Sequence, residues 1–281
     1  MNIPSGAIGL IPIIIVVIAF FVYRRIKQWR DRRIHNRPFT TEMEASLKRT
    51  LPFFDRLPQD QQERLRAKIN AFLAGKHFYG CAGLEITNEI RITIAAEACL
   101  LILNHRGEVY PGLQAILVYP SAFVVSHSEA SDDGVVFSES RDLLGESWDN
   151  GRVILAWDAV AHGAADFSDG SNVVLHEFAH QLDSLTGRAD GAPPLLRNSY
   201  KSWARVLSQN YEDLQERYSK GLDTVIDTYG ATNPAEFFAV ATETFFEKPH
   251  ELEARRPELY EELCIYYQLD PRSWQSSPAN H

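Results

Sequence analysis

Residues 173–183, with the sequence VVLHEFAHQLD, constrain this chain more than any other segment. His176 and His180 are four residues apart, and such residues lie one above the other on the same face of a helix. Two imidazoles on one helix face can bind a single metal ion. The carboxylate of Glu177 lies beside that face, where it could take a proton from an attacking water as a general base. The segment therefore predicts a metal-binding helix.

The surrounding side chains favour this interpretation over a chance match of the His-Glu-x-x-His pattern. Val174, Phe178 and Leu182 recur at helical spacing and form an apolar stripe roughly opposite the histidines. A chance match has no reason to fall on such a helix. We expect the helix to be buried on both sides.

A catalytic zinc site normally uses three protein ligands, and this helix supplies two. One known arrangement has a glycine three residues and a histidine six residues after the second histidine, but Asp183 and Thr186 occupy those positions here. Another arrangement takes a glutamate from a later helix. Residues 229–243, with the sequence YGATNPAEFFAVATE, are the candidate segment. They contain Glu236 and Glu243, seven residues apart on one helical face.

Glu236 also has a purely structural explanation. Asn233 is a favourable N-cap, Pro234 suits the first helical position, and a carboxylate at the third position can reach back to the N-cap amide. Capping alone could account for this glutamate, so the residues by themselves leave both roles open.

Three segments resemble the zinc peptidases related to Mlc titration factor A. They are the HEFAHQLD segment, the YxxxxPAExFAV run that begins at Tyr229, and the RVILAW segment that precedes the histidines, and the similarity covers residues 51–271. The resemblance implies that zinc is bound by three residues, His176, His180 and Glu236. It also implies that Glu177 is the base, that Tyr229 stabilises the transition state, and that the enzyme acts like an aminopeptidase on short peptides.

A second interpretation belongs to another functional class. The family is named for binding a regulator, so the protein could sequester a transcriptional repressor, with a structural or vestigial metal site. Structural zinc sites are normally rich in cysteine. The three cysteines, Cys81, Cys99 and Cys264, have no metal-type spacing, and Glu177 is retained. We therefore favour a peptidase with a peptide or protein substrate.

The N-terminus suggests a membrane anchor. Residues 1–23 carry no charged side chain, and residues 7–23 are almost continuously apolar, near the lower length limit for a transmembrane helix. Seven basic residues follow within residues 24–37. Because positive flanking charge stays in the cytoplasm, we expect a single-pass inner-membrane protein with a cytoplasmic catalytic domain. A buried core helix is the alternative.

Charge is distributed unevenly along the chain. The net charge is −9, and residues 24–37 contribute +6, which leaves −15 for the remainder. An acidic body whose excess of positive charge is confined to one short stretch argues against nucleic acid as a partner.

Taken together, the patterns predict an α+β fold with a small mixed sheet in a single zinc-metallopeptidase domain, behind one transmembrane helix. The expected divisions are an anchor (1–23), a basic linker with a first helix (24–50), the peptidase domain (51–272) and a flexible tail (273–281). Strands are expected at 113–119, 123–126 and 152–157. The last of these could be an edge strand that binds an extended peptide, or an internal strand.

Three further residues have open roles. Asp183 could orient the imidazole of a metal-binding histidine without itself binding the metal, or it could be an acid on the helix surface. Glu97 lies in an apolar helical segment, where a lone acid is more often paired with an arginine or at a helix edge than catalytic. His162 is close enough to the motif in sequence to be a further candidate.

Overall fold

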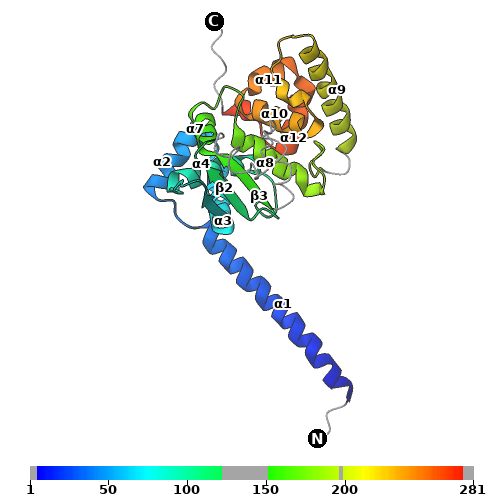
Figure 1. The fold of residues 1–281 in the computed structure, drawn as a ribbon. Helices are drawn as coiled ribbons and strands as arrows, with labels where there is room; N and C mark the ends of the chain where they lie inside the picture. The colour runs from blue at the N-terminus through cyan, green and yellow to red at the C-terminus, as the bar shows by residue number, and fades with distance from the viewer. Residues whose placement is uncertain (1–4, 122–150, 196–198, 275–281) are drawn as a thin grey trace, which may run out of the picture. The chain divides into compact units, whose positions relative to one another are not determined.

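The computed structural model describes residues 5–121, 151–195 and 199–274 (Figure 1). The chain forms two compact units, Met1–Pro38 and Phe39–His281. The predicted strand at 123–126 and the predicted tail beyond residue 274 lie outside the described residues.

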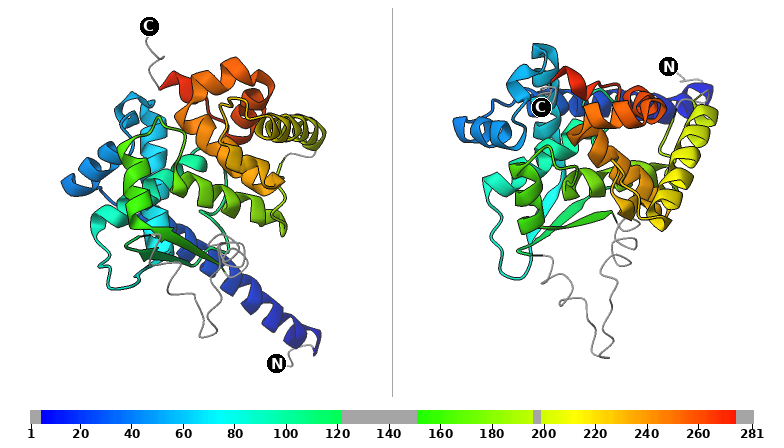
Figure 2. Two further views of the ribbon diagram at one scale, coloured as in Figure 1. Left: turned by 45° about the horizontal axis from the view of Figure 1, so that its top comes forward. Right: turned by 90° about the horizontal axis from the view of Figure 1, so that it is seen from above.

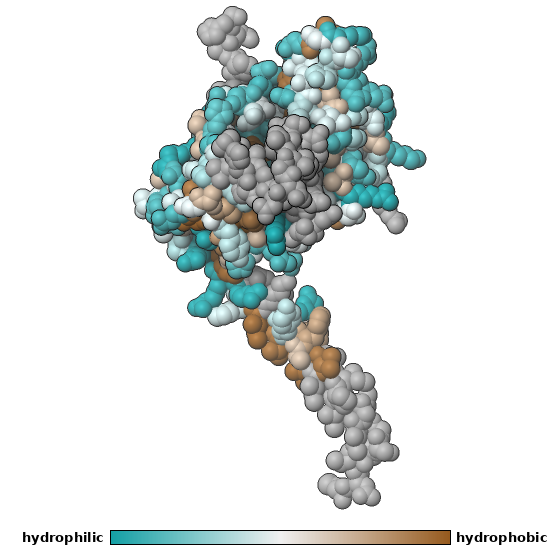
Figure 3. All heavy atoms as spheres, viewed as in Figure 1, coloured by the Kyte–Doolittle hydropathy of each residue, from teal (hydrophilic) through white to brown (hydrophobic). Residues whose placement is uncertain are grey.

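The first unit contains one helix, α1 (Ser5–His35), which continues without a break across the predicted boundary at residue 23. Apolar side chains on it are exposed, among them Val16, Phe20 and Trp29 (Figure 3). Within the described ranges, however, no helix is both long enough and apolar enough to cross a bilayer. The apolar run of residues 7–23 extends only about 25 Å as a helix, against about 30 Å of hydrocarbon. The predicted transmembrane anchor and single-pass inner-membrane location are therefore wrong, and the predicted membrane contact through this helix is not supported.

The sheet of the second unit has three described strands, β1 (His77–Gly80), β2 (Ala115–Tyr119) and β3 (Arg152–Ala156), in the order β1-β2-β3. All pairings are parallel, with His77 opposite Ala115 and Ala115 opposite Arg152. The predicted mixed sheet is therefore wrong. Parallel neighbours need a long crossover connection, and helix α4 (Asn88–Leu101) lies in the one between β1 and β2. The domain is helix-rich, with a small parallel sheet.

Helix α8 (Val173–Asp183) lies between two groups of elements (Figures 1 and 2). It contacts β3, α4 and α7 (Trp157–Ala165) on one side and α10 (Pro234–Glu247) on the other. The first group also contains α2 (Thr41–Thr50), η1 (Phe54–Arg56) and α3 (Gln59–Gly75). The second contains α9 (Tyr200–Ser219), η3 (Thr228–Ala231), α11 (Pro249–Arg255) and α12 (Pro257–Tyr267). Short turns η2 (Ser184–Thr186) and η4 (Pro271–Ser273) complete the described elements.

Helix α10 lies at the centre of the core, because every residue from Ala235 to Glu247 is buried. Its aromatic side chains pack against α12, where the ring of Phe245 lies 5.5 Å from that of Tyr267. The glutamates of α10 are buried along with these rings. A buried carboxylate is costly unless it has hydrogen-bonding or charged partners, so we expect the neighbours of α10 to supply the polar contacts of these glutamates.

Candidate metal centre

Helix α8 positions the two histidines. The Asn172 side chain caps it by accepting hydrogen bonds from the backbone nitrogens of Val174 and Leu175, at 3.1 and 3.0 Å. The i, i+4 spacing then brings Nε2 of His176 to within 3.2 Å of Nε2 of His180. The predicted helix and the shared face of its two histidines are confirmed.

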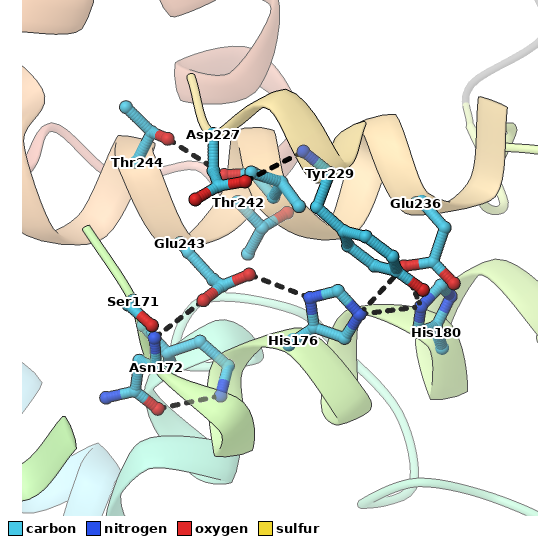
Figure 4. A network of polar contacts seen from close by, with 12 residues as sticks. Ser171, Asn172, His176, His180, Asp227, Tyr229, Glu236, Thr242, Glu243 and Thr244 are labelled. Carbon is cyan, nitrogen blue, oxygen red and sulfur yellow. Dashed lines mark hydrogen bonds and ion pairs between the residues drawn. The ribbon is translucent and has the colours of Figure 1, made fainter. Parts of the chain in front are cut away.

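Glu236 reaches the same point from the first turn of α10 (Figure 4). The Asn233 side chain caps this helix by accepting from the backbone nitrogen of Glu236 at 3.0 Å. The Glu236 carboxylate instead points at the histidines, with Oε2 2.9 Å from Nε2 of His176 and 3.4 Å from Nε2 of His180. The predicted helix start is therefore present, but the Glu236 side chain does not reach back to the cap. It contacts the two imidazoles of α8 instead.

These three side chains form a group that can hold a metal ion. Their ligand atoms are 2.9, 3.2 and 3.4 Å apart. A tetrahedral zinc ion with bonds of about 2.0 Å has ligand atoms roughly 3.3 Å apart along its edges. The donor set therefore fits a metal ion in both chemistry and spacing. Across the described ranges, no other group of three or more His, Cys, Asp or Glu residues converges in this way.

Charge in the group is balanced by a proton. Burial lowers the pKa of His176, but hydrogen bonds to the Glu236 and Glu243 carboxylates outweigh this and raise it to about 10. Burial also raises the pKa of Glu236, yet the bonds from His176 and His180 hold it well below its usual value. Burial lowers the pKa of His180. These shifts favour a protonated His176 beside an ionised Glu236, and a metal cation would take the place of the proton on Nε2 of His176.

Glu177 and Tyr229, the two residues predicted to act on substrate, both lie near His176. Glu177 follows His176 in α8, is only 3% exposed, and does not belong to the metal-binding group. The ring of Tyr229, in η3, lies 6.1 Å from that of His176, and Figure 4 shows it extending toward the histidines. Its backbone nitrogen donates to Asp227 at 2.7 Å, which fixes this short turn. The Tyr229 ring therefore borders the candidate metal position, and Glu177 is close enough that its charge raises the pKa of His176.

Other candidate residues lie elsewhere. His162 is 75% exposed and lies 3.7 Å from Asp169. Asp183 is fully buried and accepts a hydrogen bond from the Gly191 backbone nitrogen at 2.8 Å, so it is not a surface acid. Glu97 is also fully buried and accepts from the Asn172 side chain at 3.2 Å, rather than pairing with an arginine. None of the three belongs to the metal-binding group.

Sequence reasoning missed the roles of Glu243 and Asn172. Oε1 of Glu243 lies 2.7 Å from Nδ1 of His176, and Oε2 accepts from the backbone nitrogen of Asn172 at 2.6 Å. We considered Glu243 only as a substitute for Glu236. The sequence did contain a signal, the seven-residue spacing that puts both glutamates on one face of α10. Because that face packs against α8, both can contact the same histidine.

Comparison with known proteins assigns the family. The family model of the glucose-regulated metallopeptidases M90 matches residues 26–268. The chain belongs to this family. The family match and the His-His-Glu group both agree with the resemblance that the sequence motifs suggested. The predicted family is confirmed.

Relatives of this M90 chain align over most of their length. An uncharacterized protein of Synechocystis sp., slr2042, is 44% identical over 262 residues, which cover 92% of this chain and 95% of the relative. Proteins called Mlc titration factor A from Yersinia pestis and Yersinia pseudotuberculosis are each 32% identical over 238 residues, covering 82% of this chain and 87% of the relative.

Proposed function

We propose that this M90 metallopeptidase is a zinc-dependent hydrolase of peptide bonds, with His176, His180 and Glu236 as the zinc ligands. The observation that carries the proposal is the spacing of the three ligand atoms, which matches the edges of a zinc tetrahedron. A zinc ion bound there supplies Lewis acidity, which polarises the scissile carbonyl and makes water more acidic.

The chain's own residues would supply the rest of the chemistry. Glu177, buried beside the ligands, takes a proton from the attacking water and later delivers it to the leaving amine. The Tyr229 hydroxyl donates a hydrogen bond to the oxygen that becomes negatively charged. Two observations support these roles: the Tyr229 ring lies 6.1 Å from that of His176, and Glu177 follows His176 in α8 and is buried.

The substrate is proposed to be a short peptide cleaved in an aminopeptidase-like manner. Among the described strands, β3 is at the edge of the sheet and in contact with α8. An edge strand has free backbone groups with which an extended peptide can pair.

Zinc content and peptidase turnover of the full-length chain test this function together. We expect about one zinc per chain, turnover abolished by a chelator and restored by zinc, and faster cleavage of peptides with a free amino terminus than of acetylated ones. Glu177→Gln should keep zinc and lower turnover about 10²- to 10⁴-fold, because the amide is isosteric but accepts no proton. Full turnover in that variant, or in protein free of metal, would exclude the mechanism.

A second role is suggested by the name Mlc titration factor A of the Yersinia relatives. In this alternative, the protein binds a transcriptional regulator and removes it from solution. Such binding needs no general base. A regulator that is bound equally by wild type and Glu177→Gln, in protein without peptidase turnover, would favour this role.

A further inference from the structure

Two carboxylates of α10 hold the His176 ring from opposite sides (Figure 4). Glu236 contacts Nε2 at 2.9 Å, whereas Glu243, two helical turns further on, contacts Nδ1 at 2.7 Å. A metal bound through Nε2 needs the lone pair of that nitrogen, so the ring proton must be on Nδ1. Oε1 of Glu243, 2.7 Å from Nδ1, is placed to accept a hydrogen bond from that proton.

We propose that Glu243 is a positioning residue for the metal centre, holding the Nδ1 proton of His176 with one oxygen and the amide of Asn172 with the other. This inference rests on the proposed zinc site. It assigns to Glu243 a role distinct from that of Glu236, since Glu243 does not belong to the metal-binding group. Carboxylates behind a metal-binding histidine fix its tautomer and orientation and increase its basicity.

The second oxygen ties the histidine to the start of its own helix. Oε2 of Glu243 accepts from the backbone nitrogen of Asn172 at 2.6 Å, and Asn172 is the N-cap of α8. A rotation of α8 relative to α10 would break both bonds of Glu243 together. The carboxylate therefore fixes the helix that carries the ligand as well as the ring.

Asn172 is itself held from several directions. Its side-chain oxygen caps α8, and its side-chain nitrogen donates to the buried Glu97 of α4 at 3.2 Å. A Cβ atom placed on Gly163 of α7 would lie 3.2 Å from the Asn172 side chain, so α7 packs closely against it. Two elements on the sheet side of α8, α4 and α7, thus hold the residue to which Glu243 of α10 is bonded.

Only a carboxylate meets both demands on residue 243. Two N–H groups, the Nδ1–H of His176 and the backbone amide of Asn172, face this side chain and need two acceptor oxygens. Glutamine has one oxygen and one NH₂ group. It would either leave an N–H facing its NH₂ group or donate to Nδ1 and move the ring proton to Nε2, where the metal binds.

Glu243→Gln in the full-length protein tests the proposal, with Glu247→Gln as the matched control. Glu247 is on the same helix and 2% exposed, accepts a backbone hydrogen bond from Gly170 at 2.9 Å, and also bonds the Asn172 side chain. It contacts neither histidine, so it shares the link to Asn172 but lacks the bond to His176 that the proposal requires. Zinc dissociation constants are measured by competition with a chromogenic chelator. We expect Glu243→Gln to raise the dissociation constant about 10- to 100-fold, and Glu247→Gln to leave it unchanged.

A second measurement uses the wild type itself and does not depend on the variant folding. In zinc-loaded protein, histidine nitrogen shifts and long-range proton–nitrogen couplings should show His176 protonated at Nδ1 and zinc-bound at Nε2. In Glu243→Gln this Nδ1 proton should exchange faster with water. A merely structural role of Glu243 would leave the tautomer and the exchange rate unaltered.

The outcomes separate this inference from the proposed function. Wild-type zinc affinity in Glu243→Gln, or zinc bound through Nδ1 in the wild type, would overturn the role of Glu243 while leaving the zinc site intact. A wild-type chain that binds no zinc would overturn the proposed function, and this inference with it.

Discussion

At the scale of single residues, Glu236 and Glu97 show how similar burial leads to different chemistry. Glu236 is 9% exposed, but two imidazoles contact it and hold its pKa low. Glu97 is fully buried with only a neutral amide as a partner, and burial raises its pKa to about 8. The nearest charged partner, more than the depth of burial, decides whether each glutamate is ionised.

Glu236→Gln should abolish tight zinc binding while α10 still forms. The N-cap bond of Asn233 goes to the backbone nitrogen of residue 236 and survives the substitution. A neutral amide is a poor zinc ligand, so we expect the dissociation constant to rise by more than about 100-fold, the upper range for residues behind a ligand. Chelator competition and circular dichroism measure the two effects. Zinc affinity equal to that of Glu247→Gln would show that the third ligand is another residue.

Glu97→Gln should become progressively stabilising, relative to wild type, as the pH rises. The carboxyl group of Glu97 titrates near 4.5 when unfolded and near 8 when folded, so between these values only the unfolded chain releases the proton. Wild-type stability therefore falls across this window, by about 1.4 kcal/mol per pKa unit at most. Urea unfolding at a series of pH values measures the free energy of unfolding of both proteins. The difference between them isolates Glu97, because the titrations of all other groups occur in both proteins and cancel. A difference that does not vary with pH would contradict the raised pKa of Glu97.

At the scale of elements, the loop that follows α8 and leads to α9 packs against the start of α10. Gly191 is fixed by Asp183, which accepts from its nitrogen at 2.8 Å, and by Trp203, which donates to its oxygen at 2.9 Å. Its φ is +77°, and a Cβ atom there would lie 2.5 Å from the carbonyl oxygen of Pro234, the first residue of α10. Gly191 thus permits a close approach two residues from Glu236.

Gly191→Ala should therefore weaken zinc binding as well as stability. Gly187→Ala is the matched control, because Gly187 has a φ of +79° but open space around its Cβ position. Both substitutions introduce left-handed strain of about 1–2 kcal/mol. Only the first pushes on Pro234, so we expect a lower melting temperature for both variants but reduced zinc affinity for Gly191→Ala alone. Equal zinc affinity in the two variants would argue against this coupling.

At the scale of the whole molecule, the proposed metal ligands come from α8, which lies between the two groups of elements, and from α10, which belongs to one of them. Helix α8 contacts the sheet and α4, whereas α10 packs with α11 and α12. A metal ion bound by both helices would connect these groups, because the unfolded chain has no preformed site.

Zinc should therefore stabilise the protein as a whole. At a free zinc concentration 100 times the dissociation constant, we expect the free energy of unfolding to rise by about 2.7 kcal/mol. Thermal unfolding with and without zinc measures this, and Glu177→Gln should show the same shift because it keeps all three ligands. A wild-type melting temperature indifferent to zinc would rule out a metal that bridges the two helices.

The sequence by itself determined the local part of the site, because helix geometry alone relates residues a few positions apart. The His176–His180 pair and the Asn233 cap follow from spacings of four and three residues. Hydrophobic composition was a weaker guide at the N-terminus, where a run too short for a bilayer suggested an anchor. Only the tertiary structure decided the direction of the strands and the partners of Glu243, Asn172 and Gly191. Those partners are far apart in the chain, such as Glu243 and His176, and they meet only because α8 and α10 pack at one particular register.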